Sequence, residues 1–370
     1  MWDDAVLLQG RQTKRKWKEI LILVFAAAFA VGAAWAMEHQ EFLGDSWEAF
    51  WTRCNLKSDQ VWNSIGCSTE AEAFYLEDAI VYVEDGQICV ADINGNVQFR
   101  WDTLMEEPQY AQSKSAAVFY EAGGKDMFLL GADGIVHVSS ANELDAAAVS
   151  DCETAAVVTS GSGYLTVTKC YDSSGRVTKE IGLTDAAMVM MTFLRETDTL
   201  VSCLVTNQGS WVLRLDKADD TIEIPIESDI IYDLKPCGKG VALWTSDGIA
   251  LYSQAGERIA TYECASDSVI DWDSDTFAAV LTRSGTVCQL ITVAENGIKV
   301  GDAGQLAGSG ELSVCGNTVC VLDREELLFY DKSCELLGQS AYGASAQTVQ
   351  AIHGGAVLFG DGEFMCCLIS

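Results

Sequence analysis

From about residue 72 to the C-terminus, the chain consists of short apolar runs separated by turn residues, with no long stretch of helical spacing. One earlier run is different. Ile20–Met37 carries no charge and, at roughly 1.5 Å per residue, would form a helix about 27 Å long. The pattern therefore predicts one helix of membrane-spanning length followed by an all-β region.

The apolar runs recur as a unit in which one strand, a tight turn and a second strand follow each other. Glycine stands in most of these turns because tight hairpins need positive φ. From Gly86 to Gly362 the spacing averages about 39 residues. The turns are Val83–Ile88, Gly131–Ile135, Ser160–Tyr164, Thr206–Ser210, Thr245–Ile249, Thr282–Thr286, Asp323–Leu327 (without glycine) and Phe359–Glu363.

A second turn follows in several repeats and also keeps its own pattern. It reads as the outer hairpin of a four-stranded antiparallel unit. A four-stranded unit repeated every ~40 residues is typical of a β-propeller blade, so the predicted fold class is an all-β propeller. The second turns are Ala91–Val97, Tyr171–Val177, Tyr252–Ile259 and Tyr330–Leu336.

Eight repeats can be counted, but the last one stops at Ser370 after its third strand. An open ring would leave a strand edge exposed, so we expect a strand from residues 57–72 to complete the last blade. The short interval between Gly134 and Gly163 indicates that the second and third repeats are irregular or fused. The sequence favours eight blades, with seven as the alternative.

The flanks of Ile20–Met37 predict its orientation. Basic residues precede the run and acidic residues follow it, which keeps the N-terminus in the cytoplasm. The prediction is a cytoplasmic basic tail (1–19), a transmembrane signal-anchor helix (20–37) and an extracytoplasmic remainder, in a single-pass protein of the cell membrane. The flanking charges are Arg11, Lys14, Arg15, Lys16 and Lys18 before the run, and Glu38, Glu41, Asp45 and Glu48 after it.

A cleaved signal peptide is the alternative, since Ala34–Ala36 fits an A-x-A cleavage pattern. The apolar run exceeds the usual length of a signal-peptide core, which favours the anchor. Residues 38–71 then form a linker with the candidate closing strand and a juxtamembrane helix over residues 45–56. The propeller occupies residues 72–370.

The amino-acid composition limits the classes of partner that the exposed domain can bind. The whole chain has a formal net charge of −31, and without the five basic and three acidic residues of 1–37 the remainder has 18 basic and 51 acidic residues, or −33, so the exposed domain repels nucleic acid and anionic lipid headgroups. Most of the 14 cysteines lie within apolar strand patterns, as Cys89 and Cys203 do, and are expected to act as small buried hydrophobes. Two local pairs, Cys54 with Cys67 and Cys315 with Cys320, are spaced to close small loops.

Two resemblances follow from these motifs. The outer hairpin Ala91–Val97, with Asp92, Gly95 and the later Trp101, resembles repeats of quinoprotein-like and outer-membrane-assembly-type propellers. That resemblance implies that Asp and Gly shape the turn and that Trp docks one blade on another. The whole organisation resembles an uncharacterised family of single-pass, membrane-anchored propeller proteins of Gram-positive bacteria, which implies no established activity.

The sequence identifies no catalytic, cofactor-binding or metal-ligating residue. The three histidines, His39, His137 and His353, form no catalytic pattern, and no phosphate-binding loop occurs. An acidic cluster offers oxygen ligands for Ca²⁺, but its spacing matches no calcium loop and fits a solvated connection between blades. That cluster is Asp267, Asp271, Asp273 and Asp275.

The function predicted from the sequence is a non-catalytic platform that binds an envelope protein or a cell-wall component. Propellers present loops around a central channel, and loops are where function is usually carried. The alternatives are a propeller enzyme with its site at the channel mouth, and an envelope sensor.

Overall fold

The computed structural model describes residues 62–64 and 73–368, except 162, 196, 219, 266–267, 272–276, 285–286, 295–296, 305–309, 324–325, 342–345 and 361–362. Residues 55–370 form one compact unit. Within the described part of the chain, no helix is long and apolar enough to cross a membrane. The predicted helices at 20–37 and 45–56 lie outside the described residues.

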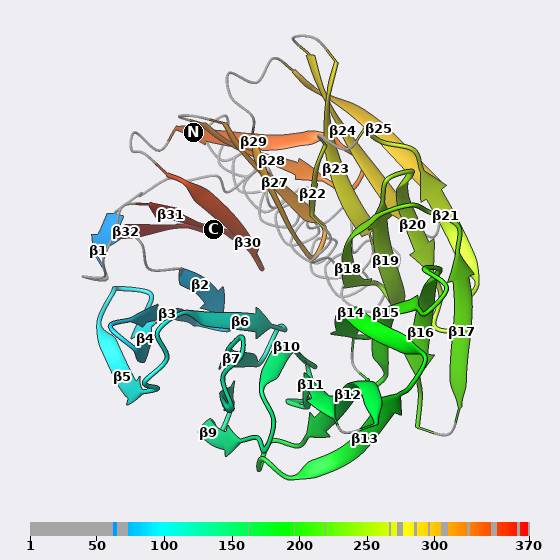
Figure 1. The fold of residues 1–370 in the computed structure, drawn as a ribbon. Helices are drawn as coiled ribbons and strands as arrows, with labels where there is room; N and C mark the ends of the chain where they lie inside the picture. Colours follow the sequence, from blue (N-terminus) through cyan, green and yellow to red (C-terminus); the bar gives the residue numbers. More distant parts are fainter. Residues whose placement is uncertain are drawn as a thin grey trace, which may run out of the picture. The chain divides into compact units, whose positions relative to one another are not determined.

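The strands form eight four-stranded antiparallel sheets, which are the blades of an eight-bladed β-propeller (Figure 1). The first strand of each blade lies nearest the centre of the ring, and the fourth lies at the periphery. Blades 1 to 4 comprise β2 (Ala73–Leu76), β3 (Ala79–Glu84), β4 (Gln87–Asp92) and β5 (Val97–Asp102); β6 (Pro108–Gln112), β7 (Ala117–Glu121), β8 (Asp126–Gly131) and β9 (Gly134–Ser139); β10 (Leu144–Val149), β11 (Ala155–Gly161), β12 (Tyr164–Tyr171) and β13 (Val177–Leu183); β14 (Ala186–Phe193), β15 (Leu200–Thr206), β16 (Trp211–Asp216) and β17 (Thr221–Ile226).

The second half of the ring repeats this plan, except that its last blade borrows a strand from the N-terminal side. Blades 5 to 8 comprise β18 (Ile231–Cys237), β19 (Gly240–Thr245), β20 (Gly248–Tyr252) and β21 (Arg258–Tyr262); β22 (Val269–Asp271), β23 (Phe277–Ser284), β24 (Val287–Ala294) and β25 (Gly297–Gly304); β26 (Glu311–Cys315), β27 (Thr318–Asp323), β28 (Glu326–Asp331) and β29 (Leu336–Ala341); β30 (Thr348–Ile352), β31 (Gly355–Gly360), β32 (Glu363–Leu368) and β1 (Trp62–Ser64).

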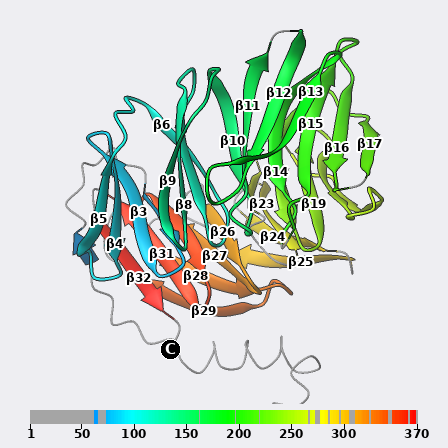
Figure 2. The ribbon, with the colours of Figure 1, turned by 90° about the horizontal axis from the view of Figure 1, so that it is seen from below.

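The ring closes between the two ends of the propeller. β1 pairs antiparallel with β32, and it lies in the stretch 57–72 where the incomplete last repeat predicts a closing strand. Blade 8 then packs on blade 1, where Ile80 and Tyr82 meet Phe359 and Phe364 in one apolar cluster. Figure 2 shows β31 and β32 beside β3 and β4. The sequence-based preference for eight blades over seven is therefore confirmed.

One of the predicted turns is wrong. Gly131–Ile135 was expected to join the two middle strands of the second blade, but it joins the outer strands β8 and β9. The middle turn of this blade contains Gly123 and Gly124. Both hairpins need positive φ (109° at Gly134 and 81° at Gly123), so glycine alone does not identify which hairpin is present. Blades 2 and 3 are separate and four-stranded, not irregular or fused.

The outer turns share one polar arrangement. In blade 1, the Asp92 carboxylate accepts hydrogen bonds from the backbone N–H groups of Asn94 and Asn96, both at 2.9 Å. Gly95 takes the positive φ of 83° that this turn requires. Asp172 and Asp331 accept equivalent pairs of backbone bonds in blades 3 and 7. The role that the resemblance implied for Asp and Gly is therefore present.

Trp101 also has the implied docking role. It lies on β5 of blade 1 and packs against a cluster that includes Phe119 and Phe128 of blade 2. Similar apolar clusters join other neighbouring blades, such as Leu213 and Leu243 between blades 4 and 5. The core of the propeller is thus a series of layers between blades, and each blade is stabilised by its two neighbours.

The described cysteines are thiols rather than disulfides. Cys89, Cys203, Cys288 and Cys320 are buried, as the apolar strand pattern predicts. The predicted Cys315–Cys320 disulfide does not form, because Cys320 points into the blade 7–8 contact, where its thiol lies 3.8 Å from the Gly355 carbonyl oxygen. Cys54 and Cys67 lie outside the described residues.

Candidate functional site

The topology brings two sets of loops together on each face of the propeller. Four antiparallel strands return the chain to the side on which the blade began, so all inner strands begin on one face. We call it the start face. It carries the connections between blades and the turns between the second and third strands. The opposite face is the end face, which carries the outer turns.

The central channel holds a cavity of about 1150 Å³, which residues of all eight inner strands line. This volume is sufficient for a small-molecule ligand. The lining mixes polar and apolar side chains, and its charged members carry both signs. Its charged members are Asp151, Arg195, Asp233, Lys235, Asp271 and Glu363.

An inner strand has a free edge along the channel, and side chains of neighbouring blades satisfy part of it. The clearest case is Gln350 on β30. Its amide oxygen accepts a hydrogen bond from the Tyr75 backbone N–H at 2.6 Å, and its amide nitrogen donates to the Tyr75 carbonyl at 2.9 Å. The Gln350 side chain therefore pairs with β2 as another strand would, at the point where the ring closes.

Other inner strands use the same device. The Asp271 carboxylate accepts from the Val314 N–H at 2.8 Å, which joins blade 6 to blade 7. The Ser313 hydroxyl oxygen accepts from the Ala351 N–H at 2.9 Å, which joins blade 7 to blade 8. These polar groups of the channel wall thus stabilise the ring.

Glu311 makes a fourth contact of this kind. Its carboxylate accepts from the Val349 N–H at 3.2 Å. Burial raises the pKa of Glu311, and the bond from Val349 opposes this shift only in part. The hydrogen bond helps to hold blade 7 against blade 8, but burial of the charged carboxylate costs desolvation free energy.

Three consecutive blades differ from the rest at the channel rim. The inner strands β10, β14 and β18 each contain a β-bulge near their beginning, so that one residue has no partner on the next strand. The extra residues are Asp145, Val189 and Tyr232. Among the described residues, the other five inner strands pair without a register shift. Bulges re-aim side chains and are frequent beside functional sites.

The bulged residues are exposed near the start face, one or two positions before residues that line the channel. Val189 is 45% exposed and Tyr232 is 37% exposed, and Ile230 in the preceding connection is 49% exposed. The Tyr232 ring lies 4.9 Å from the Trp244 ring, which supports it from the next strand. We call Asp145, Val189, Ile230 and Tyr232 the blade 3–5 rim.

Carboxylates surround this rim. The nearby connections and turns on the start face (140–143, 184–185, 207–210, 227–230 and 246–247) contain no Lys or Arg. The connection over 227–230 is held by the Trp211 indole N–H, which donates to the Asp229 carbonyl at 3.3 Å. The rim therefore combines apolar side chains with a negative border formed by Glu143, Asp185, Glu227, Asp229 and Asp247.

The residues considered from the sequence do not assemble into a reactive site. His137 on β9 lies 2.8 Å from the Asp126 carboxylate and stacks on Phe128, with both polar side chains about half exposed. His353 lies in an exposed turn of blade 8. Of the acidic cluster Asp267, Asp271, Asp273 and Asp275, Asp271 accepts a hydrogen bond from the blade 7 backbone, and the other members lie outside the described residues. Within the described ranges, no three His, Cys, Asp or Glu side chains group around a candidate metal position.

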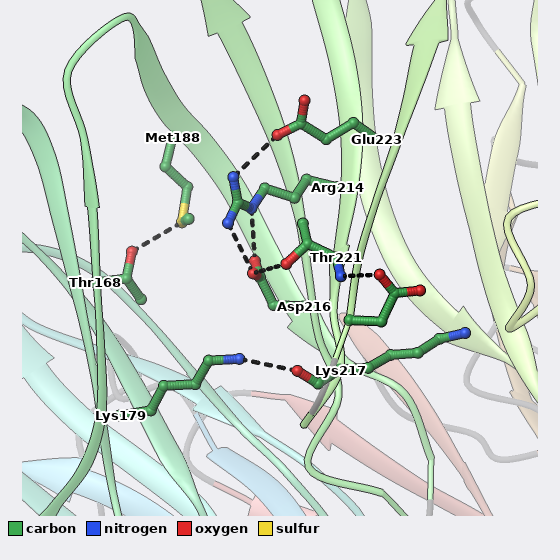
Figure 3. A network of polar contacts seen from close by, with 9 residues as sticks. Thr168, Lys179, Met188, Arg214, Asp216, Lys217, Thr221 and Glu223 are labelled. Atoms are coloured by element: carbon green, nitrogen blue, oxygen red, sulfur yellow. Dashed lines mark hydrogen bonds and ion pairs between the residues drawn. The ribbon is translucent and has the colours of Figure 1, made fainter.

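A charged network lies away from the channel, in blade 4 (Figure 3). The Arg214 guanidinium donates two bonds of 2.9 Å to Asp216 and one of 3.0 Å to Glu223. Asp216 is only 2% exposed, and its bonds raise the pKa of Arg214. Lys179 of blade 3 donates to the Lys217 carbonyl at 3.4 Å beside it. The network fixes the strands of blade 4 and has no access to the channel wall.

Residues 54–210 match a family described as a family of unknown function (DUF5711). No curated protein matches this chain in sequence. The family match covers blades 1 to 3 and the first two strands of blade 4, β14 and β15, so it includes two of the three bulged inner strands.

Solved structures with the same architecture are distant in sequence. AztD from Citrobacter koseri is 13% identical, with a TM-score of 0.55 over 79% of this chain and 90% of that chain. BamB from Moraxella catarrhalis is 12% identical, with a TM-score of 0.51 over 84% and 96%. The dihydro-heme d1 dehydrogenase NirN is 14% identical, with a TM-score of 0.52 over 83% and 74%. These likenesses show the propeller fold alone.

Proposed function

We propose that this propeller is a non-catalytic binding platform and that the blade 3–5 rim is its contact surface. The observation that carries the proposal is the run of three bulges in β10, β14 and β18, which turns Asp145, Val189 and Tyr232 outward in adjacent blades. A ring of mutually packed blades holds these side chains in place, so little order is lost when a partner binds.

The chemistry of the rim favours a partner with basic residues beside an apolar anchor. Tyr232 and Val189 supply contact area, and aromatic residues are frequent at binding hot spots. The acidic border would attract cationic groups over distances up to about 10 Å at moderate salt. Anionic lipids and nucleic acids would be repelled.

The proposal includes the cellular setting. A cytoplasmic tail, a membrane anchor at Ile20–Met37 and an extracytoplasmic propeller place the rim in the cell envelope, where the partner is an envelope protein or a cell-wall component. The charge asymmetry around the apolar run supports this orientation. Protease added outside intact cells should remove epitopes beyond residue 60 and leave an N-terminal epitope.

The binding proposal is tested by affinity capture from solubilised envelopes with the full-length protein. A variant with Val189→Ser and Tyr232→Ser should lose the captured partner. Val177→Ser is the matched control, because Val177 is 53% exposed but begins β13 on the end face. Raising the salt concentration should slow association with the wild type. Equal capture by the rim variant and the control, or turnover of a small molecule by the purified protein, contradicts the proposal.

A further inference from the structure

Leu104 has an unusual combination of backbone conformation and exposure. It lies on the start face, in the connection between blades 1 and 2, with a φ of 60° and 92% of its surface exposed. A bulky residue is disfavoured at positive φ, where glycine and asparagine are tolerated best. Because it is exposed, the Leu104 side chain also contributes no hydrophobic stabilisation to the fold. The fold therefore maintains Leu104 in a conformation that its own side chain opposes.

The residues on either side of Leu104 are fixed. The Thr103 backbone N–H and hydroxyl both donate to the Gly86 carbonyl, at 2.8 and 2.7 Å. The next residue, Met105, is buried between blades 1 and 2 and donates its N–H to the Thr103 hydroxyl at 3.3 Å. The backbone before and after Leu104 is thus anchored to the propeller.

A carboxylate fixes the rest of the connection. Glu121 of blade 2 accepts hydrogen bonds from the N–H groups of Glu106 and Glu107, each at 3.0 Å. The whole segment is bonded to both blades, and Leu104 projects from it into solvent. Its position is set before any partner arrives, which lowers the entropy lost on binding.

The other described non-glycine residues with positive φ have local reasons for it. They lie in two-residue hairpins or outer turns, except Glu153, which lies in a turn where the Ser150 hydroxyl oxygen accepts hydrogen bonds from the Cys152 and Thr154 N–H groups at 3.2 and 3.0 Å. The Thr103 hydroxyl bonds the backbone around Leu104 in a similar way, but among these described residues Leu104 is the apolar side chain that is exposed, and strain of this kind is concentrated at binding sites. The remaining members of the set are Glu77, Asp85 and Cys334.

The residues around Leu104 indicate which kind of partner surface it would contact. Residues 84–87 and 101–109 contain five carboxylates and no Lys or Arg. A membrane surface with anionic lipids would be repelled, and so would a second copy of this chain, whose net charge is −31. A protein with an apolar pocket bordered by basic side chains is complementary to both features. The exposed acids are Asp85, Asp102, Glu106 and Glu107.

We propose that Leu104 is a preformed anchor that inserts into an apolar pocket, bordered by Lys or Arg, on a partner protein. This inference rests on the proposed binding function but uses residues of blades 1 and 2, not the blade 3–5 rim. It assigns the strain at Leu104 to recognition rather than to folding.

Stability and binding should then respond in opposite directions. In the full-length protein, Leu104→Gly and Leu104→Asn should unfold at the same temperature as the wild type or higher, because both residues tolerate a φ of 60°. Partner binding should fall about tenfold or more in both variants. A lower unfolding temperature for both variants would show that Leu104 serves the fold and would overturn the inference.

A photo-crosslinking amino acid at position 104 tests the partner directly in intact cells. We expect one protein adduct, crosslinked through a peptide that contains Lys or Arg next to apolar residues, and a loss of that adduct in Glu106→Lys, Glu107→Lys. An adduct with lipid or with another copy of this chain, or no adduct, overturns the inference. The same crosslinker at position 232 separates the two proposals, since an adduct at 232 alone leaves the platform function intact.

Discussion

The Gln350 amide offers a quantitative test of how the ring is held closed. Gln350→Ala removes two hydrogen bonds to Tyr75, at 2.6 and 2.9 Å, that cross from blade 8 to blade 1. Each bond contributes about 1 kcal/mol net, and the half-buried Tyr75 backbone groups can be partly rehydrated from the channel. We therefore expect a loss of about 2 kcal/mol in the free energy of unfolding.

For a folding unit of about 300 residues, this loss lowers the melting temperature by about 3 °C. Gln350→Glu should cost more at neutral pH than at acidic pH, because a carboxylate keeps the acceptor for the Tyr75 N–H but faces the Tyr75 carbonyl oxygen without a proton. The assay is thermal and urea unfolding of the purified protein, followed by far-UV circular dichroism.

The matched control is Gln109→Ala, which truncates an exposed glutamine of the channel wall on β6. We expect that change to stay within about 0.5 kcal/mol. If Gln350→Ala is as mild as the control, the amide does not contribute to closure, and the apolar contact between blades 8 and 1 must hold the ring without it.

Four further predictions follow from contacts described above. Because burial raises the pKa of Glu311, ionisation in the folded protein costs stability as the pH rises from about 4.5 through the raised pKa. Glu311→Gln should therefore gain stability relative to the wild type between about pH 4 and pH 7, and a constant difference across that range would contradict this. Asp216→Ala should cost about 3 kcal/mol, because it leaves Arg214 without its main partner, whereas removal of the half-exposed Glu223 carboxylate should cost below about 1 kcal/mol in chemical denaturation. Denatured protein alkylated without reductant should react at most of its 14 cysteines, and fewer than about four reactive thiols would reveal disulfides. Deleting β1 should lower the melting temperature by exposing the β32 edge, and an unchanged melting temperature would show that β1 is dispensable.

Much of the fold could be predicted from the sequence because turn chemistry is local. Positive φ at Gly86 and Gly95, with Asp92 bonding the turn, leaves a pattern that recurs from blade to blade. In blade 2 the same pattern led to a wrong prediction, because the positive φ of Gly134 would suit the middle turn as well as the outer turn that it forms. Counting complete strands at the C-terminus was sufficient to predict the closing strand.

The candidate site could not be predicted in the same way. A β-bulge such as that at Val189 or Tyr232 depends on the register between two strands, which no single stretch of sequence specifies. Nothing in the sequence distinguishes Gln350 from other polar residues, because its pairing with Tyr75 depends on closure of the ring. Leu104 and Met105 form an apolar pair in the sequence, and only the structure shows that Met105 is buried and Leu104 is exposed.

The pairing of the first strand with the last in blade 8 constrains the order in which this protein can fold during synthesis. β1 is synthesised before every other strand of the propeller, yet its partner β32 emerges about 300 residues later. Blades 1 to 7 can each form from contiguous segments as the chain appears, but blade 8 can form only after synthesis is nearly complete. Until then the edge of β1 has no partner, so the nascent protein is most vulnerable to misassociation just before its last strand arrives.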